Sequence, residues 1–537
     1  MNIDDGRTVE ELAAAFQAAE AEEITQTEID SDSVSPDANP RSWRQTNEGM
    51  ARILVERHIN DLRFVYDLAK SVKDSEYFAT WNGQRWETSS LAVIQLAQWM
   101  RDMTAELREE AAKVLAEALK VPFIEAGELE PKFGRFKKQL DDFQKRFIGF
   151  SSNAESTTFK SAWQQQIKTH QAIQIKFTEF DQDPWLLNCQ NGTLNLETGE
   201  LLPFRREDYI TKQIDVAYDP EATCPEWDKF LNRIFQKKVD GKLVPDPDLI
   251  GYLQQAVGYS LTGQTSEECF FICWGTGGNG KSKFLGAISD LLGPYAAAPS
   301  IETFLDAKRN SQGASEDIAS LRGARLAVAT EPDDGARLAA GLLKRMSGRD
   351  EMSARFLFQN SFKFKPTHKL WLLVNEEPQL NGSDGGIKRR LRKIPFTAQL
   401  ADTEIDKALD IKLRKELPGI LNWAIAGVKA WKACEKGLVS PEVIQAASDS
   451  YFTDQDSVQA FITDRCVVGG EEYHCRPSDI YAAYSRYCEQ MHIKAQTKQA
   501  FGRDLTKKKF VLSEDSRTRY GLQLDRTQQP SYQRDEE

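Results

Sequence analysis

The sequence lacks several features that would assign it to familiar protein classes. It contains no run of about 18 consecutive apolar residues, so no membrane-spanning helix is expected. Its N-terminus is acidic and lacks the basic-then-apolar layout of a signal peptide. The eight cysteines show no paired framework, which favours a reducing compartment. We therefore expect a cytoplasmic protein that does not associate with membranes.

Support for a zinc site is weak. One group of potential ligands lies close together near the C-terminus: Cys466, His474, Cys475, Cys488 and His492. Their spacings match no standard zinc pattern, so small buried thiols are favoured over a metal centre.

The net charge of −12 is unevenly distributed along the chain. Residues 1–40 contain eleven acidic residues and one arginine, a net charge of −10, which leaves −2 for the other residues. The overall acidity therefore does not argue against nucleic-acid binding, which depends on local basic faces. The acidic segment is expected to be disordered, either as a solubilising tail, which its composition favours, or as a partner-binding one.

One short motif carries the strongest functional signal. An apolar run at residues 269–274 precedes it and a helical pattern at residues 283–292 follows it. The motif itself is Gly275, Thr276, Gly277, Gly278, Asn279, Gly280, Lys281 and Ser282. In such a strand, glycine loop and helix, backbone N–H groups wrap a polyphosphate, Lys281 reaches the phosphates and Ser282 can ligate Mg²⁺. The helix N-terminus also favours an anion. The motif predicts ATP and Mg²⁺ as cofactors.

Polar residues follow two further predicted strands. The strand at residues 325–330 ends in Glu331, the Walker B arrangement of a carboxylate beside Mg²⁺ and the attacking water. The strand at residues 369–374 ends in Asn375, which is either a sensor of the γ-phosphate or an ordinary strand-end residue. A basic run at residues 388–393 contains Arg389 and Arg390. This run is either a solvated face or the source of an arginine finger for a neighbouring subunit.

A β-hairpin is predicted between these two strands, because Phe and Lys alternate over residues 361–365. In a ring-shaped ATPase this hairpin would face the central channel.

The C-terminal region predicts a helix, a basic helix and a strand hairpin, which is the order of a winged helix. The alternative is a solvated helix face. Candidate phosphate contacts are Lys498, Arg503, Lys507, Lys508, Arg517 and Arg519.

The order of these motifs resembles the superfamily 3 helicases of the phage and plasmid primase-helicase type, which include the poxvirus primase-helicase. The matching segments are residues 277–282, the strand ending in Glu331, residues 347–350, 354–356 and 364–366, Asn375 and residues 387–390. Residues 81–86, 191–194 and 417–424 extend the likeness, which covers residues 50 to 525 approximately.

This resemblance implies an AAA+-like hexameric ring with ATP bound between subunits and 3′→5′ translocation on single-stranded DNA. Lys281 and Ser282 would hold phosphate and Mg²⁺, Glu331 would activate water, and Asn375 would sense the γ-phosphate. Arg389 or Arg390 would be the finger supplied in trans. The hairpin around Gln359 would touch DNA, and Arg355, Lys363 or Lys365 would share the phosphate contact. The family also suggests a phage, prophage or mobile element as the source.

The chain departs from this family at its N-terminal end. Residues 1–215 contain no convincing Asp-x-Asp polymerase site and no zinc-knuckle spacing. We therefore expect a helicase without primase activity, served by a separate primase or polymerase if one is needed. The alternative is a DNA-binding replication initiator that ATP switches without processive unwinding. A packaging or defence ATPase is disfavoured because no nuclease motif is present.

The expected fold is an α/β P-loop ATPase core with an α-rich N-terminal domain and a C-terminal winged-helix domain. The expected boundaries are an acidic tail at 1–45, an α-rich domain at 46–215, a helical connector at 216–265, the ATPase core at 266–400, a helical segment at 401–450, the winged helix at 451–525 and a polar tail at 526–537. Within the α-rich domain we expect β-hairpins at residues 78–86 and 191–200 and a helix at residues 135–146. A polar loop at residues 237–246 is expected to interrupt the connector.

Overall fold

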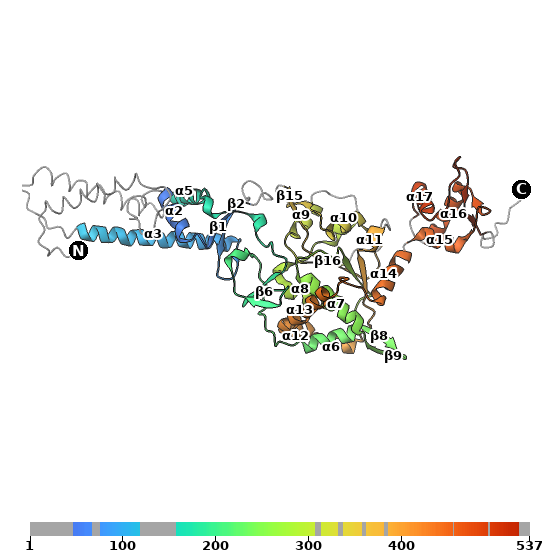
Figure 1. The fold of residues 1–537 in the computed structure, drawn as a ribbon, viewed down its shortest axis with the longest axis horizontal. Helices are drawn as coiled ribbons and strands as arrows, with labels where there is room; N and C mark the ends of the chain where they lie inside the picture. Colours follow the sequence, from blue (N-terminus) through green and yellow to red (C-terminus); the bar gives the residue numbers. More distant parts are fainter. Residues whose placement is uncertain are drawn as a thin grey trace, which may run out of the picture. The chain divides into compact units, whose positions relative to one another are not determined.

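The computed structural model describes residues 47–66, 76–118, 157–306, 313–330, 337–356, 361–380, 385–454, 456–491 and 495–525. Two compact units divide the chain: residues 1–63 with 93–174, and residues 64–92 with 175–537 (Figure 1). Both predicted tails and a helix expected at residues 135–146 lie outside the described residues. Within the described ranges, no helix is long and apolar enough to cross a membrane.

The first unit consists of helices in its described part. They are α2 (Asn47–Arg57), α3 (Ser90–Ala118), which begins in the second unit, and α5 (Thr157–Lys168). Helix α2 lies against α5 and buries Leu54, while α5 buries Trp163 and Ile167. Trp163 and Ile167 are four residues apart, so they share one helical face. His58 stacks on Trp99 with ring centroids 3.9 Å apart.

The second unit begins with two small sheets, and the second of them is antiparallel. The first has the order β3-β2-β1-β4 and consists of β1 (Leu62–Tyr66), β2 (Glu76–Trp81), β3 (Trp86–Glu87) and β4 (Gln174–Lys176). The second consists of β5 (Leu186–Cys189), β6 (Gly192–Asn195) and β7 (Glu200–Leu202). Trp81 pairs with Trp86 around a turn in which Gly83 has a φ of 96°. The hairpins predicted at residues 78–86 and 191–200 are therefore confirmed.

A five-stranded parallel sheet follows, in the order β11-β12-β16-β10-β18. Its strands are β10 (Phe270–Trp274), β11 (Ala296–Ala297), β12 (Leu326–Thr330), β16 (Lys369–Val374) and β18 (Leu391–Pro395). Most are short apolar runs, which is typical of strands covered on both faces. The predicted α/β layout of alternating strands and helices is confirmed.

Helices cover both faces of this sheet (Figure 1). Along β10, Phe271 and Cys273 pack into one core, and Phe270 and Ile272 into the other, because successive strand residues point to opposite faces. The first core is built with α6 (Pro225–Ile234), α7 (Pro247–Leu261), α8 (Lys281–Leu292), α12 (Leu409–Lys415) and α13 (Leu417–Ala433). The second core is built with α9 (Gly313–Ser320), α10 (Ala340–Met346), α11 (Gly385–Lys388) and α14 (Glu442–Asp454).

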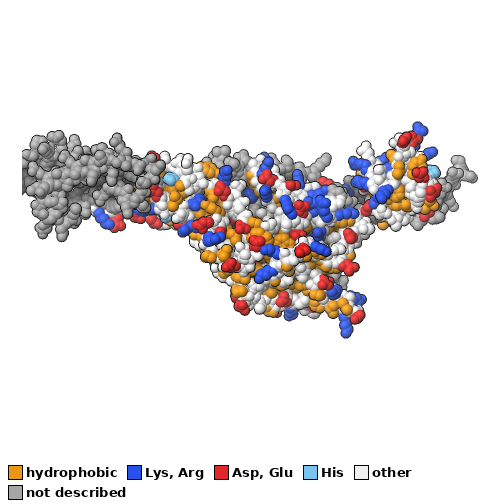
Figure 2. Space-filling view, viewed as in Figure 1, with side chains coloured by type: hydrophobic (Ala, Val, Ile, Leu, Met, Phe, Trp, Pro, Cys, Tyr) orange, Lys and Arg blue, Asp and Glu red, His pale blue; other side chains and the backbone are white. Residues whose placement is uncertain are grey.

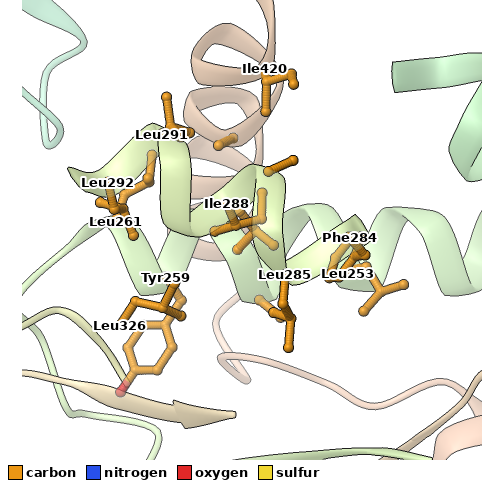
Figure 3. Packing of buried hydrophobic residues seen from close by; sticks show 14 of the residues in the cluster. Leu253, Tyr259, Leu261, Phe284, Leu285, Ile288, Leu291, Leu292, Leu326 and Ile420 are labelled. Atoms are coloured by element: carbon orange, nitrogen blue, oxygen red, sulfur yellow. The ribbon is translucent and has the colours of Figure 1, made fainter. Parts of the chain in front are cut away.

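Helix α8 is the helix that starts at the glycine-rich loop, and one of its faces is fully apolar. Five of its buried side chains are Phe284, Leu285, Ile288, Leu291 and Leu292, and their cluster includes Leu253, Tyr259, Leu261, Leu326 and Ile420 (Figure 3). Each such side chain contributes about 1.5–3 kcal/mol when buried, which gives on the order of 10 kcal/mol before conformational entropy is subtracted. This packing fixes the direction from which the helix N-terminus meets the loop.

Helices α7 and α13 cross unusually closely, because glycines lie at the crossing. A Cβ atom on Gly427 would lie 1.9 Å from the carbonyl oxygen of Gln254, and one on Gly258 would lie 2.4 Å from the backbone nitrogen of Val428. Only hydrogen side chains permit these separations. Both helices pack in the same core as α8 and one face of β10, the helix and strand that flank the glycine loop.

Smaller strand pairs extend from the core. They are β8 (Gln236–Val239) with β9 (Lys242–Pro245), β13 (Arg337–Leu338) with β17 (Gln379–Leu380), and β14 (Met352–Arg355) with β15 (Ser361–Phe364). The last pair confirms the strands of the predicted hairpin. The loop expected at residues 237–246 was wrong: β8 and β9 form a hairpin there, because Asp240 and Gly241 both adopt positive φ, as a two-residue turn requires.

Residues 457–525 form a small α+β domain. Its elements are α15 (Ser457–Arg465), β19 (Cys466–Val468), β20 (His474–Cys475), α16 (Pro477–Gln490), α17 (Lys498–Lys507), β21 (Arg519–Tyr520) and β22 (Leu522–Leu524). Phe461, Tyr484 and Phe501 lie at its centre, and the rings of Tyr484 and Phe501 stack 4.4 Å apart. Strand β19 pairs with β22 and β20 with β21. The predicted helices at residues 478–488 and 497–509 are confirmed as α16 and α17.

Candidate functional site

The glycine-rich loop connects β10 to α8 and adopts backbone conformations that require glycine. Gly277, Gly278 and Gly280 have φ values of 78°, 62° and 89°, a region that other residues seldom occupy. Residues 276–278 are exposed, and Gly280 is the N-cap of α8. The loop thus presents backbone to solvent at the positive end of a helix, which is a favourable place for an anion.

Both ends of the loop are anchored to the protein. The Asn279 side-chain amide donates to the Phe396 carbonyl oxygen over 2.8 Å. A Cβ on Gly275 would lie 2.2 Å from Nδ2 of Asn279 and 2.3 Å from that same Phe396 oxygen, so position 275 tolerates no larger side chain. A Cβ on Gly280 would lie 2.9 Å from Ile234, the last residue of α6. The loop therefore has one defined shape.

Lys281 and Asn375 meet although they lie 94 residues apart in the sequence. The buried Lys281 ammonium donates to Oδ1 of Asn375 over 3.1 Å, to Oδ1 of Asn279 over 3.2 Å, and to the Gly275 carbonyl oxygen. Ser282 is exposed on the first turn of α8. The structure thus brings together the loop lysine and the strand-end amide, each of which the sequence predicted as a phosphate contact.

The topology explains this meeting. Strand β16 lies between β10 and β12, and all three strands are parallel, so their carboxyl ends share one edge of the sheet. Trp274 pairs with Val374, and Thr330 pairs with Leu373, so the strand ends are level. Glu331, which follows Thr330 in the sequence, lies outside the described residues, and its predicted role stays a prediction.

Arg389 and Arg390 lie at the opposite edge of the sheet. They directly precede β18, whose Leu391 pairs with Phe270 at the start of β10, whereas Pro395 pairs with Trp274 beside the loop. Four residues of strand, about 13 Å at 3.3 Å each, separate these two levels. Neither arginine is placed to reach phosphates bound at its own loop.

The two arginines have different surroundings. Arg390 is largely buried, and its guanidinium donates to a Glu268 carboxylate oxygen over 2.5 Å and to the Gly386 carbonyl oxygen over 3.1 Å. Arg349 approaches the other oxygen of Glu268 at 3.7 Å. Arg389 is exposed. Of the pair, only Arg389 presents its side chain to solvent.

Other cations of the core have structural roles that the sequence did not indicate. Lys393, inside the predicted basic run, is buried and binds the Glu377 carboxylate two residues beyond Asn375. Lys369 is buried under the carbonyl oxygens of Thr262, Gln264 and Thr367, and burial lowers its pKa well below the usual value. No sequence signal separates these lysines from exposed ones, because their partners are distant in the chain.

The β14–β15 hairpin has a buried face and a basic, exposed face. Met352 pairs with Phe364 and Ala354 with Phe362 on the buried side, while Ser353 pairs with Lys363 and Arg355 with Ser361 on the exposed side. Arg355 and Lys363, both predicted DNA contacts, therefore share one face, and Lys365 is exposed just beyond it. Gln359 lies outside the described residues.

The basic residues predicted at the C-terminal domain separate into two groups. Lys498, Arg503, Lys507 and Arg517 are exposed. Lys508 binds the Asp456 carboxylate over 2.6 Å, and the buried Arg519 guanidinium donates to the carbonyl oxygens of Phe510 and Gly502. The second group thus holds the domain together, whereas the first faces solvent, with Lys507 also paired to Asp504 over 3.1 Å. In Figure 2, basic and acidic side chains are interspersed over the visible face of the molecule.

Metal-binding geometry is not found in the described part of the chain, where no group of three or more His, Cys, Asp or Glu side chains is arranged to hold an ion. His492 lies outside it. Burial raises the pKa of Cys466 to about 12 and that of Cys475 to about 11, so both stay protonated thiols at neutral pH.

Two family models match the chain. Residues 51–236 match a family described as D5 N terminal like, and residues 273–390 match a family of unknown function. The second match contains the glycine loop, Asn375 and the two arginines. The first covers the segment that precedes the nucleotide core.

Several relatives of this chain come from viruses. A protein of Acanthamoeba polyphaga mimivirus named "Putative helicase" is 26% identical over 437 residues, which is 78% of this chain and 43% of that protein. Another so named, from Frog virus 3, is 26% identical over 243 residues, 41% of this chain and 24% of that protein. The chain spans less than half the length of these relatives.

Among solved structures, the apo A form of the NrS-1 C terminal region is similar at 11% identity, with a TM-score of 0.42, over 91% of this chain and all of that one. The resemblance to helicases of the primase-helicase type, predicted from the sequence, is confirmed by the family and viral matches.

Proposed function

We propose that this protein is an ATP-driven DNA helicase of superfamily 3, belonging to a phage, prophage or mobile element and acting in DNA replication. The observation that carries the proposal is the contact between Lys281 and Asn375 at the carboxyl edge of the parallel sheet. That contact joins a phosphate-binding loop to the strand end where a γ-phosphate sensor is expected.

The residues present fit a nucleoside triphosphate with Mg²⁺. Three left-handed glycines expose backbone N–H groups at a helix N-terminus, and the Ser282 hydroxyl lies beside them. The partners of the Lys281 ammonium include neutral carbonyl and amide oxygens, and anionic phosphate oxygens are stronger acceptors than these. Lys281 would hold phosphate, Asn375 would sense it, and Ser282 with Glu331 would hold Mg²⁺. When bound, ATP supplies the free energy of phosphoryl transfer.

The position of the arginines supports a ring of subunits, which we propose is a hexamer. Arg389 is exposed at the edge of the sheet far from its own loop, so it can stabilise transferring phosphate only at a neighbouring subunit's loop. Arg390 is bound to Glu268, which favours Arg389 as the finger. The basic faces of the β14–β15 hairpin and of the proposed winged helix would contact single-stranded and duplex DNA, with 3′→5′ translocation.

The decisive experiment measures ATP hydrolysis and unwinding of forked duplexes with either a 3′ or a 5′ single-stranded tail. Lys281→Ala should lose hydrolysis by about 100-fold or more, because a buried charge aimed at the phosphates is removed. Lys283→Ala is the matched control, since Lys283 lies two residues away on α8 and is half exposed with its partner Asp410. Its activity should stay within about twofold of wild type.

Two outcomes would contradict the motor. Unwinding that survives Lys281→Ala would show that the loop does not drive it. Hydrolysis by the wild type without separation of either fork would instead support the ATP-switched initiator.

A further inference from the structure

Arg322 occupies an unusual position between aromatic rings of two separate segments. It lies in the turn between α9 and β12. Its guanidinium carbon lies 3.8 Å from the ring centroid of Phe177, which follows β4, and 4.6 Å from that of Phe362 in β15. Phe356, at the other side of the same hairpin, lies 5.9 Å away. One cation therefore contacts the N-terminal strand segment and the β14–β15 hairpin together.

The turn that carries Arg322 is fastened to the N-terminal segment at two further points. Lys212 donates to the Gly323 carbonyl oxygen over 2.6 Å. Arg325, buried at the start of β12, donates to the carbonyl oxygens of Leu186 and Leu261. The turn and the segment of residues 175–216 are thus held together, and β12 leads from this turn to the nucleotide edge of the sheet.

The hairpin is held differently, by stacked rings. Phe362 stacks on Phe356 with centroids 5.5 Å apart and planes 19° from parallel. Phe362 belongs to the buried face of the hairpin, directly across the strand from the exposed Arg355–Lys363 face. A shift of this ring therefore changes where the exposed cations lie.

We propose that Arg322 is a positioning residue that fixes the β14–β15 hairpin against β12 and the N-terminal segment, so that events at the nucleotide site reach the hairpin. The inference rests on the proposed motor function. Arginine suits this role because its guanidinium is planar, always charged and able to stack on aromatic faces, whereas the ammonium of lysine is a point charge.

The test compares Arg322→Met, which keeps the reach but loses the charge and the plane, with Arg322→Lys, which keeps the charge. Arg205→Met is the matched control, because Arg205 is half exposed in the same N-terminal segment and pairs with Asp208. Rates of ATP hydrolysis are measured without and with single-stranded DNA, and amide hydrogen exchange is followed in β15.

In Arg322→Met the basal rate should stay within about twofold of wild type, while the DNA-stimulated rate falls about fivefold to tenfold and exchange in β15 rises by a similar factor. Arg322→Lys should recover part of both losses, and Arg205→Met should change neither. A split between basal and stimulated rates is not expected of a residue that merely stabilises the fold.

Failure of this inference and failure of the proposed motor function would give different results. If the wild type is stimulated by DNA and Arg322→Met is stimulated equally, the inference is overturned while the motor stands. If DNA does not stimulate ATP hydrolysis by the wild type, the proposed motor function is wrong. The exchange measurement alone then decides whether Arg322 positions the hairpin. Unchanged exchange in β15 would show that Arg322 does not position the hairpin.

Discussion

The two adjacent arginines before β18 should respond to substitution in opposite ways. Arg389→Ala is expected to abolish hydrolysis without affecting stability, because its side chain is exposed and would act only at a neighbouring subunit. Fingers of this kind are worth about 10³-fold or more in turnover. Removal of an exposed side chain changes the free energy of unfolding by about 0.5 kcal/mol at most.

Arg390→Ala is expected to act on stability. The side chain is 13% exposed, and its guanidinium binds Glu268, which is 37% exposed, and the Gly386 carbonyl oxygen. Hydrogen bonds to charged groups contribute about 1.5–3 kcal/mol when buried, but water can re-solvate a carboxylate as exposed as Glu268, so about 1–2 kcal/mol is the expected loss. At about 2–4 °C per kcal/mol in a domain of ordinary size, the melting temperature should fall by about 2–8 °C.

The assay is hydrolysis per subunit with thermal unfolding of each variant, followed by mixing. Arg389→Ala and Lys281→Ala subunits, each inactive alone, should regain activity when mixed, because some interfaces then pair an intact loop with an intact finger. The reasoning would be refuted if the mixture gained nothing over its parts, or if Arg389→Ala unfolded earlier while Arg390→Ala lost turnover at unchanged stability.

Two further predictions concern stability. Gly427→Ala should lower the free energy of unfolding by about 3 kcal/mol in urea titrations, because its Cβ would overlap the Gln254 carbonyl at the α7–α13 crossing. Its control, Gly251→Ala on open α7 surface, should raise that energy by about 0.5–1 kcal/mol; equal effects would contradict the close crossing. His368 is buried with both ring nitrogens unpartnered, and burial lowers its pKa to about 3. As the pH falls through about 6.5, His368 binds a proton in the unfolded state but stays neutral in the folded state. The free energy of unfolding should therefore decrease, and the contribution of His368 to that decrease is about 1.4 kcal/mol between about pH 7.5 and 5.5. His368→Leu should remove that part of the pH dependence, and an unaltered dependence would show that another group causes it.

Local chain chemistry was sufficient to predict much of the core. The glycine loop, the apolar strand before it and the helix after it are contiguous. The local sequence of residues 270–292 was therefore sufficient to predict all three elements. The Phe and Lys alternation of β15 likewise predicted the strand and its exposed face. The β8–β9 hairpin was missed although Asp240-Gly241 is a strong turn signal, because lysines occur on both faces of the hairpin and no clear alternation results.

The sequence by itself predicted which residues would bind phosphate, since a glycine loop is a local backbone device. It also determined the order of strands along the chain and the location of the basic segments. Only the tertiary structure decided which cations are available. Arg390, Lys393 and Arg519 look like Arg389 and Arg503 in the sequence, yet the first three are held by partners distant in the chain. Their roles depend on contacts between segments that sequence neighbours do not encode, and the same is true of the rings that enclose Arg322.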